Sequence, residues 1–183
     1  DKDIIIIADE IYEKIIYNKK HYSFQAYTDN AITINGFSKA YAMTGLRSGY
    51  CSSNSEIIDE ILKVHQYNVA CVDTATQKAC TTALTSSQQC VNDMRNEFEK
   101  RRNLVVESLN NMGLECSNPD GAFYVFFHAG NSQEFIEKAL TEDVILVPGL
   151  AFGSMGREYV RLSYAQSYEN LEKAMKRLEK VVV

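Results

Sequence analysis

Residues 31–50 read AITINGFSKAYAMTGLRSGY, and this stretch carries the most information about the fold and the chemistry of the chain. Its apolar start, Ala31 to Asn35, predicts a buried strand. Ser38 and Lys39 follow that strand among small residues, and Arg47 comes eight positions after the lysine. Because ligands of open α/β sheets bind at the carboxyl ends of the strands, the stretch predicts a binding site directly after a strand.

The side chains of this stretch suit a cofactor that has both an aldehyde and a phosphate group. A lysine that forms an imine needs an uncrowded, partly deprotonated amine, and Lys39 has small neighbours. Hydroxyls and a planar guanidinium hold phosphate, and Ser38 and Arg47 supply these groups. Three glycines, which let a backbone approach a ligand closely, lie in the same stretch: Gly36, Gly45 and Gly49. A Ser-Lys pair taken alone is most often part of a solvated turn.

The composition is that of a globular enzyme and argues against two other classes of protein. The chain has 183 residues, of which 45% are hydrophobic and 23% are charged, as expected for one or two domains. The net charge is -5 without a long basic stripe, so we predict no nucleic-acid partner. The sequence has no run of about 18 apolar residues, so we predict no membrane span and expect a cytoplasmic location.

The cysteines and histidines do not follow a metal-binding pattern. The five cysteines include no Cys-x-x-Cys pair, and the three histidines are scattered. We therefore predict no metal site and interpret the cysteines as reduced packing residues. The cysteines are Cys51, Cys71, Cys80, Cys90 and Cys116.

A second informative segment is the run from Ile4 to Ala8, which is almost entirely β-branched. Such a run is typical of a buried parallel strand, which needs neighbours on both sides. We therefore expect further strands outside these residues and interpret the chain as a fragment. Asp9 follows this strand as Lys39 follows the next one, so both side chains are expected to face one crevice.

The remaining pattern predicts helices and then a smaller α+β unit. Residues 10–17 are expected to form a turn and a second strand. Capping boxes at Ser53/Glu56 and Thr74/Gln77 predict two helix starts, and Gly113 is expected to end a third helix that begins near Ser87. The expected later elements are strands at 114–116, 122–127, 144–147 and 159–165 and helices at 131–140 and 168–180. The domain boundary is expected near residue 105.

Four segments resemble motifs of the class I/II aminotransferases and occur in the same order. They are ADEIYE at 8–13, the serine-lysine stretch, PDGAFY at 119–124 and VRLSYA at 160–165. The whole chain resembles the C-terminal half of these fold-type I pyridoxal phosphate enzymes, which form the aspartate aminotransferase superfamily. The resemblance implies an α/β fold. Residues 1–105 would be part of a large cofactor-binding domain with a mostly parallel sheet flanked by helices, and residues 106–183 a small α+β domain.

The resemblance also implies a role for each candidate residue around pyridoxal 5'-phosphate. Lys39 would form the Schiff base and act as the general base and acid of the proton shift. Asp9 would pair with the pyridine nitrogen, and Tyr12 would hydrogen-bond the ring hydroxyl. Ser38 and Arg47 would bind the phosphate.

Arg161 would bind the α-carboxylate of the substrate through a two-pronged contact. The implied reaction is amino group transfer between an L-amino acid, of aspartate or aromatic type, and a 2-oxo acid. A homodimer is the expected assembly. Several cofactor contacts of the family belong to its N-terminal half, so these 183 residues by themselves are expected to be inactive.

Two alternatives to transamination stay open at this point. The same residues would serve a β-lyase, because the fold holds the cofactor while the substrate pocket selects the chemistry. The chain could also act as a non-catalytic fold or dimerisation fragment, whose exposed sheet edge and apolar faces promote association.

Overall fold

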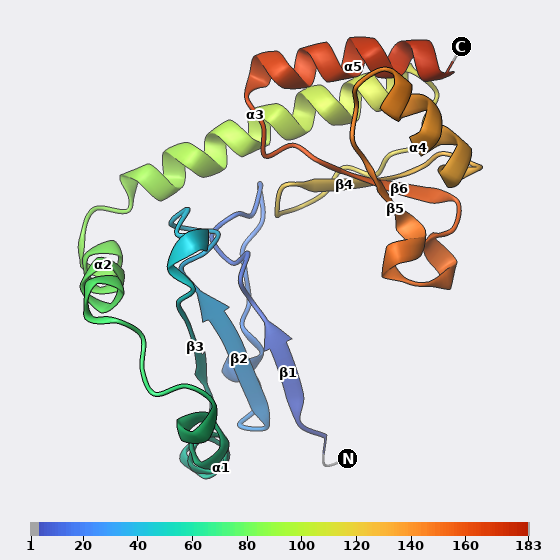
Figure 1. Ribbon diagram of the computed structural model, residues 1–183. Helices are drawn as coiled ribbons and strands as arrows, with labels where there is room; N and C mark the ends of the chain where they lie inside the picture. The colour runs from blue at the N-terminus through green and yellow to red at the C-terminus, as the bar shows by residue number, and fades with distance from the viewer. Residues whose placement is uncertain (1–3, 183) are drawn as a thin grey trace. The chain divides into compact units, whose positions relative to one another are not determined.

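The computed structural model describes residues 4–182, and the chain forms two compact units, Asp1–Asp93 and Met94–Val183 (Figure 1). The units divide within helix α3 (Gln89–Asn111), which begins in the first unit and continues in the second. The domain boundary expected from the sequence, near residue 105, falls in the same helix. Strands and helices alternate along much of the chain, as predicted for an α/β protein.

The first unit contains a three-stranded sheet in the order β1-β2-β3 (Figure 1). β1 (Ile6–Asp9) pairs in parallel with β2 (Ala31–Gly36), and β3 (Gly49–Ser52) pairs antiparallel with β2. The strand predicted at 31–35 is therefore confirmed and lies at the centre of this sheet. Alternate residues of β2, beginning with Ala31, are buried, as expected for a central strand.

β1 is shorter and less buried than the sequence pattern predicts. Ile4 and Ile5 precede the strand and are 58% and 57% exposed, and Ile7 is 68% exposed. Within the described residues, β1 has a pairing partner, β2, along one edge. The apolar run has the composition of a strand that has neighbours on both sides. The described residues supply a neighbour on one side, β2.

The prediction of a second strand ending near residue 17 is wrong, because the chain forms turns after β1. The backbone N–H of Glu13 donates to the carbonyl of Glu10 at 2.9 Å, and that of Ile15 donates to Tyr12 at 2.8 Å. Ile15 is fully buried. The apolar residues that suggested a strand are thus buried by a turn.

The helices of the first unit are capped one residue away from the predicted positions. They are α1 (Ser55–Asn68), α2 (Thr74–Thr85) and the start of α3. Asn54 and Asp73 are the N-caps, and each side chain accepts a backbone N–H of the first helical turn, at 2.9 and 3.0 Å. The capping boxes predicted at Ser53 and Thr74 are therefore wrong. The Ser53 hydroxyl instead donates to the carbonyl of Ala31 at 2.7 Å, which ties the start of α1 to β2.

The second unit contains an antiparallel sheet in the order β4-β6-β5. The strands are β4 (Tyr124–His128), β5 (Val147–Pro148) and β6 (Tyr159–Ser163), and the further helices are α4 (Ser132–Thr141) and α5 (Tyr168–Val182). The strand predicted at 114–116 is wrong, since Cys116 forms a single bridge to Phe127. The strand predicted at 144–147 is shorter and begins later, since β5 shares Val147 with that range and continues to Pro148.

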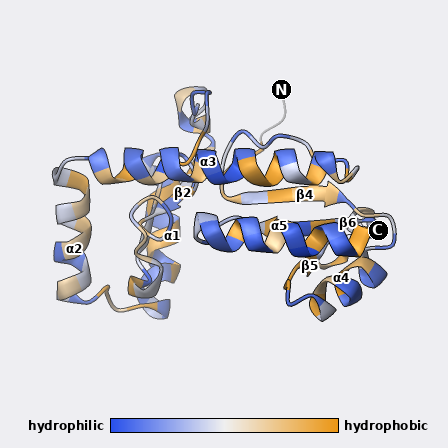
Figure 2. Ribbon diagram, turned by 90° about the horizontal axis from the view of Figure 1, so that it is seen from above, coloured by the Kyte–Doolittle hydropathy of each residue, from blue (hydrophilic) through white to orange (hydrophobic). Residues whose placement is uncertain are grey.

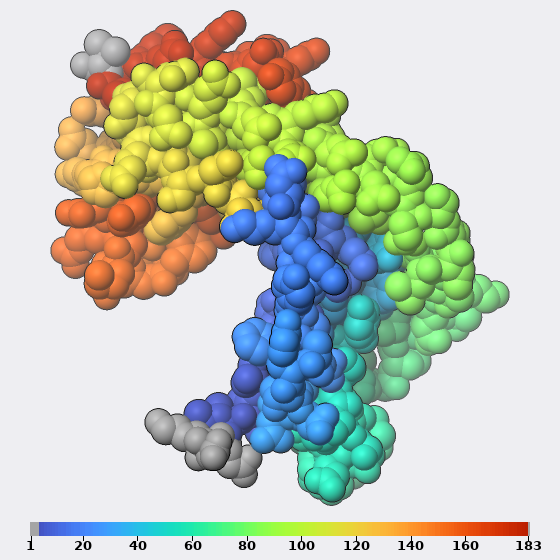
Figure 3. All heavy atoms as spheres, turned by 180° about the vertical axis from the view of Figure 1, so that it is seen from behind, coloured from blue at the N-terminus to red at the C-terminus, as the bar shows by residue number. Residues whose placement is uncertain are grey.

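Helices cover one face of the second sheet. α5 and the C-terminal part of α3 run side by side in Figures 1, 2 and 3, and Figure 2 shows bands of hydrophobic residues along α5. Leu171, Met175 and Leu178 are the buried residues of α5, at the spacing of one helical face. The end of α3 is confirmed, because Gly113 has a positive φ of 77° and the N–H of Leu114 bonds back to the helix.

The interpretation of the cysteines as packing residues is confirmed for two of the five. Cys80 and Cys116 are buried, whereas Cys51, Cys71 and Cys90 are exposed, and all five are free thiols. Within residues 4–182, none of the helices is both long and apolar enough to cross a bilayer.

Candidate active site

The register of the first sheet brings three of the predicted polar segments to one edge. Asp9, the last residue of β1, pairs with Ile34 near the end of β2. β3 runs the other way and begins at Gly49, opposite Gly36. One edge of the sheet is thus the edge at which β1 and β2 end and β3 begins. This edge carries Asp9, the Ser38-Lys39 segment after β2 and Arg47 before β3.

A short loop between β2 and β3 carries the lysine and the arginine. The Thr44 hydroxyl donates to the carbonyl of Ser38, and Arg47 Nη1 donates to the carbonyl of Thr44, both at 3.1 Å. Arg47 has a left-handed backbone with φ of 51° and is exposed, while Ser38 and Lys39 are half-buried. Within the described residues, Arg47 uses one of its five N–H donors in this contact, so the others can reach a phosphate.

Two of the three glycines in this stretch serve strand packing. A Cβ on Gly36 would lie 3.0 Å from the Cα of Gly49, and a Cβ on Gly49 would lie 2.9 Å from the carbonyl oxygen of Asn35. No atom lies within 4 Å of the corresponding point at Gly45. The close approach that Gly36 and Gly49 permit is therefore between β2 and β3, a reason that the sequence analysis did not find.

Asp9 and Tyr12 lie on the strand end and the turn that follows it. Asp9 is exposed, and its Oδ1 accepts the backbone N–H of Ile11 at 3.3 Å. The other carboxylate oxygen has no hydrogen-bond partner within residues 4–182. Tyr12 is half-buried in the turn over residues 11–14.

Glu10, next to Asp9, organises a polar cluster that the sequence analysis missed. It is 7% exposed; its Oε2 pairs with His21 Nε2 at 2.9 Å, and its Oε1 accepts from the Ser23 hydroxyl at 2.9 Å and the Phe24 N–H at 3.3 Å. Burial raises the pKa of this carboxyl, but the hydrogen bonds from His21, Ser23 and Phe24 outweigh it, so the pKa is lowered. Glu10 thus ties the loop at 21–24 to the end of β1.

A second acidic side chain, Glu13, approaches the same cluster. One ligand atom each from Glu10, Glu13 and His21 lie within 4.8 Å of one another, a set of oxygen and nitrogen atoms that a metal ion could use. Both oxygens of Glu10 already accept hydrogen bonds or pair with His21, as expected for a structural cluster. No spacing rule joins these residues in sequence, which is why the sequence did not reveal them.

A cavity of about 340 Å³ lies beside the lysine segment in the first unit. Phe37, Ala40 and Tyr41 line it, and the Tyr41 hydroxyl donates to Oε1 of Gln88, another lining residue, at 3.0 Å. Tyr50 is on its wall, and burial followed by the negative charge of Glu13 raises the pKa of that hydroxyl. None of the predicted site residues lines this cavity.

Arg161, the remaining predicted site residue, lies in the middle of β6 in the second unit. It faces Phe126 of β4 and Val147 of β5 across the ladders. Its guanidinium carbon lies 4.5 Å from the ring centroids of both Tyr124 and Phe152. Within residues 4–182 the guanidinium makes no ion pair or hydrogen bond, so its N–H donors are available to an anion.

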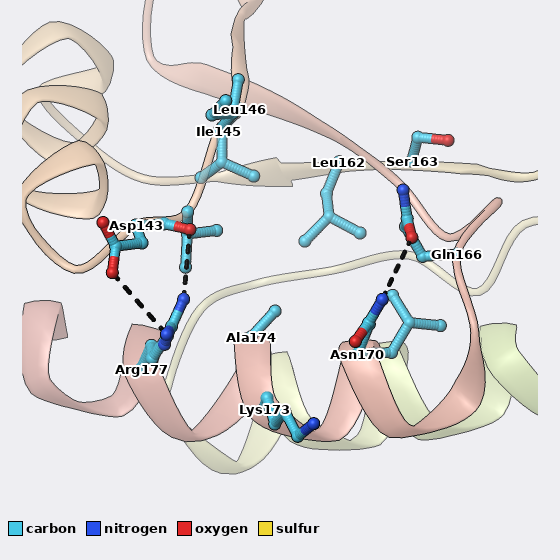
Figure 4. A pocket seen from close by; sticks show the side chains of 12 residues that line it. Asp143, Ile145, Leu146, Leu162, Ser163, Gln166, Asn170, Lys173, Ala174 and Arg177 are labelled. Carbon is cyan, nitrogen blue, oxygen red and sulfur yellow. Dashed lines mark hydrogen bonds and ion pairs between the residues drawn. The ribbon is translucent and has the colours of Figure 1, made fainter.

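A larger pocket of the second unit, about 410 Å³, does not contain Arg161. It lies between α5 on one side and, on the other, residues 143–146, which precede β5, together with the end of β6 (Figure 4). Arg177 bonds to the carbonyl of Asp143 at 3.4 Å, and its ion pair with the Asp143 carboxylate measures 3.6 Å. Apolar walls come from residues such as Ile145 and Leu162. No residue predicted to act in catalysis points into this pocket.

Comparison with known proteins gives the family context of these residues. The family described as "Aminotransferase class I and II" matches residues 1–178. The chain is 46% identical over 184 residues to a probable aspartate aminotransferase of Methanocaldococcus jannaschii, covering 96% of this chain and 49% of that protein. It is 46% identical to an aspartate aminotransferase of Pyrococcus abyssi, covering 100% of this chain and 50% of that protein.

Solved structures agree with the sequence relatives. The crystal structure of an aromatic aminotransferase from Pyrococcus horikoshii OT3 matches with a TM-score of 0.93 and 44% identity, over 98% of this chain and 51% of that one. The chain therefore spans about half the length of the relatives it matches, and its assignment to their C-terminal half stays a prediction. The family matched by residues 1–178 is the one that the motifs indicated: this chain belongs to the class I and II aminotransferases.

Proposed function

We propose that this chain carries part of the active site of a pyridoxal phosphate-dependent aminotransferase. The observation that carries the proposal is the sheet register of the first unit, which attaches Asp9, Lys39 and Arg47 to one edge. The reaction would transfer an amino group between an L-amino acid and a 2-oxo acid. Relatives named as aspartate and aromatic aminotransferases support substrates of these two types.

The donor set at this edge suits pyridoxal phosphate. It combines an amine on Lys39, a carboxylate on Asp9, a phenol on Tyr12, a hydroxyl on Ser38 and a guanidinium on Arg47. Ser38 and Arg47 would hold the phosphate dianion, since hydroxyl and guanidinium groups donate to phosphate oxygens. When bound, pyridoxal phosphate supplies an electron-accepting ring that stabilises negative charge at the substrate Cα.

Each remaining residue would have a distinct task. Asp9, with one carboxylate oxygen unpaired within the described residues, would keep a proton on the pyridine nitrogen. Tyr12 would donate to the ring oxygen. Lys39 would hold the cofactor and then take the proton from the substrate Cα and return it.

Arg161 of the second unit would bind the α-carboxylate of the amino acid. Its N–H donors have no partner within residues 4–182, and a guanidinium can bond both oxygens of a carboxylate in one plane. We further propose that the first unit is part of a fold-type I cofactor-binding domain, that the second is its small α+β domain, and that the whole protein is a homodimer.

Absorbance of added pyridoxal phosphate tests the central part of this proposal. The chain and a full-length protein containing it should develop a lysine-dependent band near the visible, which borohydride removes. Lys39→Ala should abolish the band. Lys63→Ala is the control and should keep the band, because Lys63 is an exposed residue of α1 that pairs with Glu60. A full-length protein whose band survives Lys39→Ala would overturn the assignment.

The reaction itself is tested with the full-length protein and a panel of amino acids plus 2-oxoglutarate. Formation of glutamate and a 2-oxo acid in equal amounts supports transamination. Release of ammonia without an amino acceptor would show a lyase instead.

A further inference from the structure

The sheet face that carries Arg161 is unusually rich in aromatic side chains. In β4 and β6 the residues facing the helices are buried, among them Val125 and Val160, and the intervening residues lie on the opposite face. Phe126 is 41% exposed on that opposite face and stacks on Tyr159, with ring centroids 5.2 Å apart. An arginine is thus surrounded by rings rather than by carboxylates.

The strand order explains how two rings reach the guanidinium from different sides of β6. β6 lies between β4 and β5, and Arg161 is opposite Phe126 in the β4 ladder. Tyr124, two residues before Phe126, is therefore a diagonal neighbour of Arg161 on the same face. Phe152 comes from the segment that follows β5, on the other side of β6. Each ring centroid lies 4.5 Å from the guanidinium carbon.

Two glycines keep the segment that bears Phe152 close to the sheet. A Cβ on Gly149 would lie 2.6 Å from the Tyr159 carbonyl oxygen and 2.8 Å from the Phe126 ring, and it would also overlap Gly156. Such contacts are shorter than real Cβ contacts, so these backbones approach as closely as glycine permits. Phe152 is 54% exposed, and its segment lies against the sheet because the backbone at Gly149 and Gly156 approaches so closely.

Contact with rings holds an arginine differently from an ion pair. A cation over a ring face is attracted by the ring quadrupole, and a guanidinium also stacks on aromatic rings. Neither contact uses an N–H donor or cancels the positive charge. An arginine paired with a carboxylate would use N–H donors in that pair, and the carboxylate would offset its positive charge. Within residues 4–182, Arg161 has no carboxylate partner.

We propose that Tyr124 and Phe152 are positioning residues for carboxylate recognition. They hold the Arg161 guanidinium before the substrate arrives and leave its charge and its N–H donors available to the substrate carboxylate. The gain is preorganisation, because an arginine whose torsions are already restricted loses less entropy on binding. This inference rests on the proposed role of Arg161 as the α-carboxylate ligand.

Steady-state kinetics of a full-length, cofactor-loaded protein containing these residues provides the first test. Tyr124→Leu and Phe152→Leu remove one ring each and should raise KM for the amino acid on the order of fivefold, with kcat changed less than about twofold. Tyr124→Phe and Phe152→Tyr keep the rings and should keep KM. Phe98→Leu is a matched control, since this ring packs on Phe123 and Tyr164 rather than on Arg161.

Spectroscopy of the 183-residue chain provides a second test that does not depend on activity. With ¹⁵N-labelled arginine, the Arg161 Nε–H proton, assigned by its loss in Arg161→Lys, should resonate upfield because of the two rings. The upfield shift should vanish in the double leucine variant and remain in Tyr124→Phe. Added succinate should move the Arg161 resonance more in the unmutated chain than in the double leucine variant.

The outcomes separate this inference from the proposed function. If Arg161→Lys leaves KM unchanged, the assigned role of Arg161 fails, and the positioning role fails with it. If Arg161→Lys raises KM strongly while both leucine variants behave like Phe98→Leu, the positioning role is overturned and the proposed function stands.

Discussion

Gly36 of β2 and Gly49 of β3 face each other so closely that a Cβ on Gly36 would lie 3.0 Å from the Gly49 Cα. This contact is the last pair of the β2–β3 ladder, directly next to the loop that carries Lys39 and Arg47. Both obstructing atoms at Gly36, the Gly49 Cα and the Ser48 carbonyl oxygen, belong to the backbone, so neither can rotate away.

Gly49→Ala should therefore destabilise the chain by about 1–3 kcal/mol through overpacking, as followed by urea unfolding. Its Cβ would lie 2.9 Å from the Asn35 carbonyl oxygen. Gly45→Ala is the matched control, because the structure leaves that point open, and it should change stability by less than about 1 kcal/mol. Equal effects of the two substitutions would show that the strand contact has no special cost.

Stability in acid should depend on Glu10. Its pKa in the folded chain is lowered from the ordinary 4.5, so the carboxylate stabilises the fold above that pH. This contribution should be lost as pH falls through the folded-state pKa. As the pH is lowered from neutral through the folded-state pKa of Glu10, the thermal unfolding midpoint should fall less steeply in Glu10→Gln than in the unmutated chain. Glu13→Gln is the control, and an unchanged slope in Glu10→Gln would contradict the prediction.

Arg102 should contribute more to stability than its neighbour Arg101. Arg102 is 5% exposed, donates to the Pro119 carbonyl at 3.1 Å and pairs with Glu99 at 3.2 Å. Arg102→Leu should cost about 2–3 kcal/mol, because it leaves the half-buried Pro119 carbonyl and the half-buried Glu99 carboxylate with fewer partners.

Arg101→Leu supplies the comparison for this prediction. Arg101 pairs with Glu97 one helical turn away, at 2.9 Å, where both side chains are more exposed. Its loss should cost less than about 1 kcal/mol in chemical denaturation. Comparable losses for the two arginines would contradict the structural role of Arg102.

The thiols should react in two groups with a disulfide reagent at pH 8. Cys51, Cys71 and Cys90 are exposed and should react quickly. Burial raises the pKa of Cys116 to about 11, so it should be very slow in the folded chain. A variant that keeps Cys116 as its single thiol, with the other four cysteines changed to serine, should react slowly until urea is added. Rapid reaction of that variant without urea would refute the burial of Cys116.

Much of the fold could be predicted because the signals are local. β2 is a short apolar strand with polar residues immediately after it, and α3 is an amphipathic helix that ends at Asn111, just before Gly113. Local signals misplaced the helix starts by one residue, since neighbouring Ser53 and Asn54 can both cap. Asn54 is the cap because the Ser53 hydroxyl bonds to β2 instead. The turn after β1 was missed because its apolar residues also suit a strand.

The family and the candidate residues could be predicted from the sequence, because motif order and side-chain chemistry are properties of the chain alone. The side chains around Arg161 became visible in the folded chain alone. The sheet register agrees with the expectation from the sequence that Asp9 and Lys39 follow strands at one edge of the sheet. The strand order, in contrast, brings Tyr124 and Phe152 to Arg161, which the sequence pattern did not predict. These contacts join residues distant in sequence, and no local pattern encodes them, because they arise when separate strands pair and bury their apolar faces together.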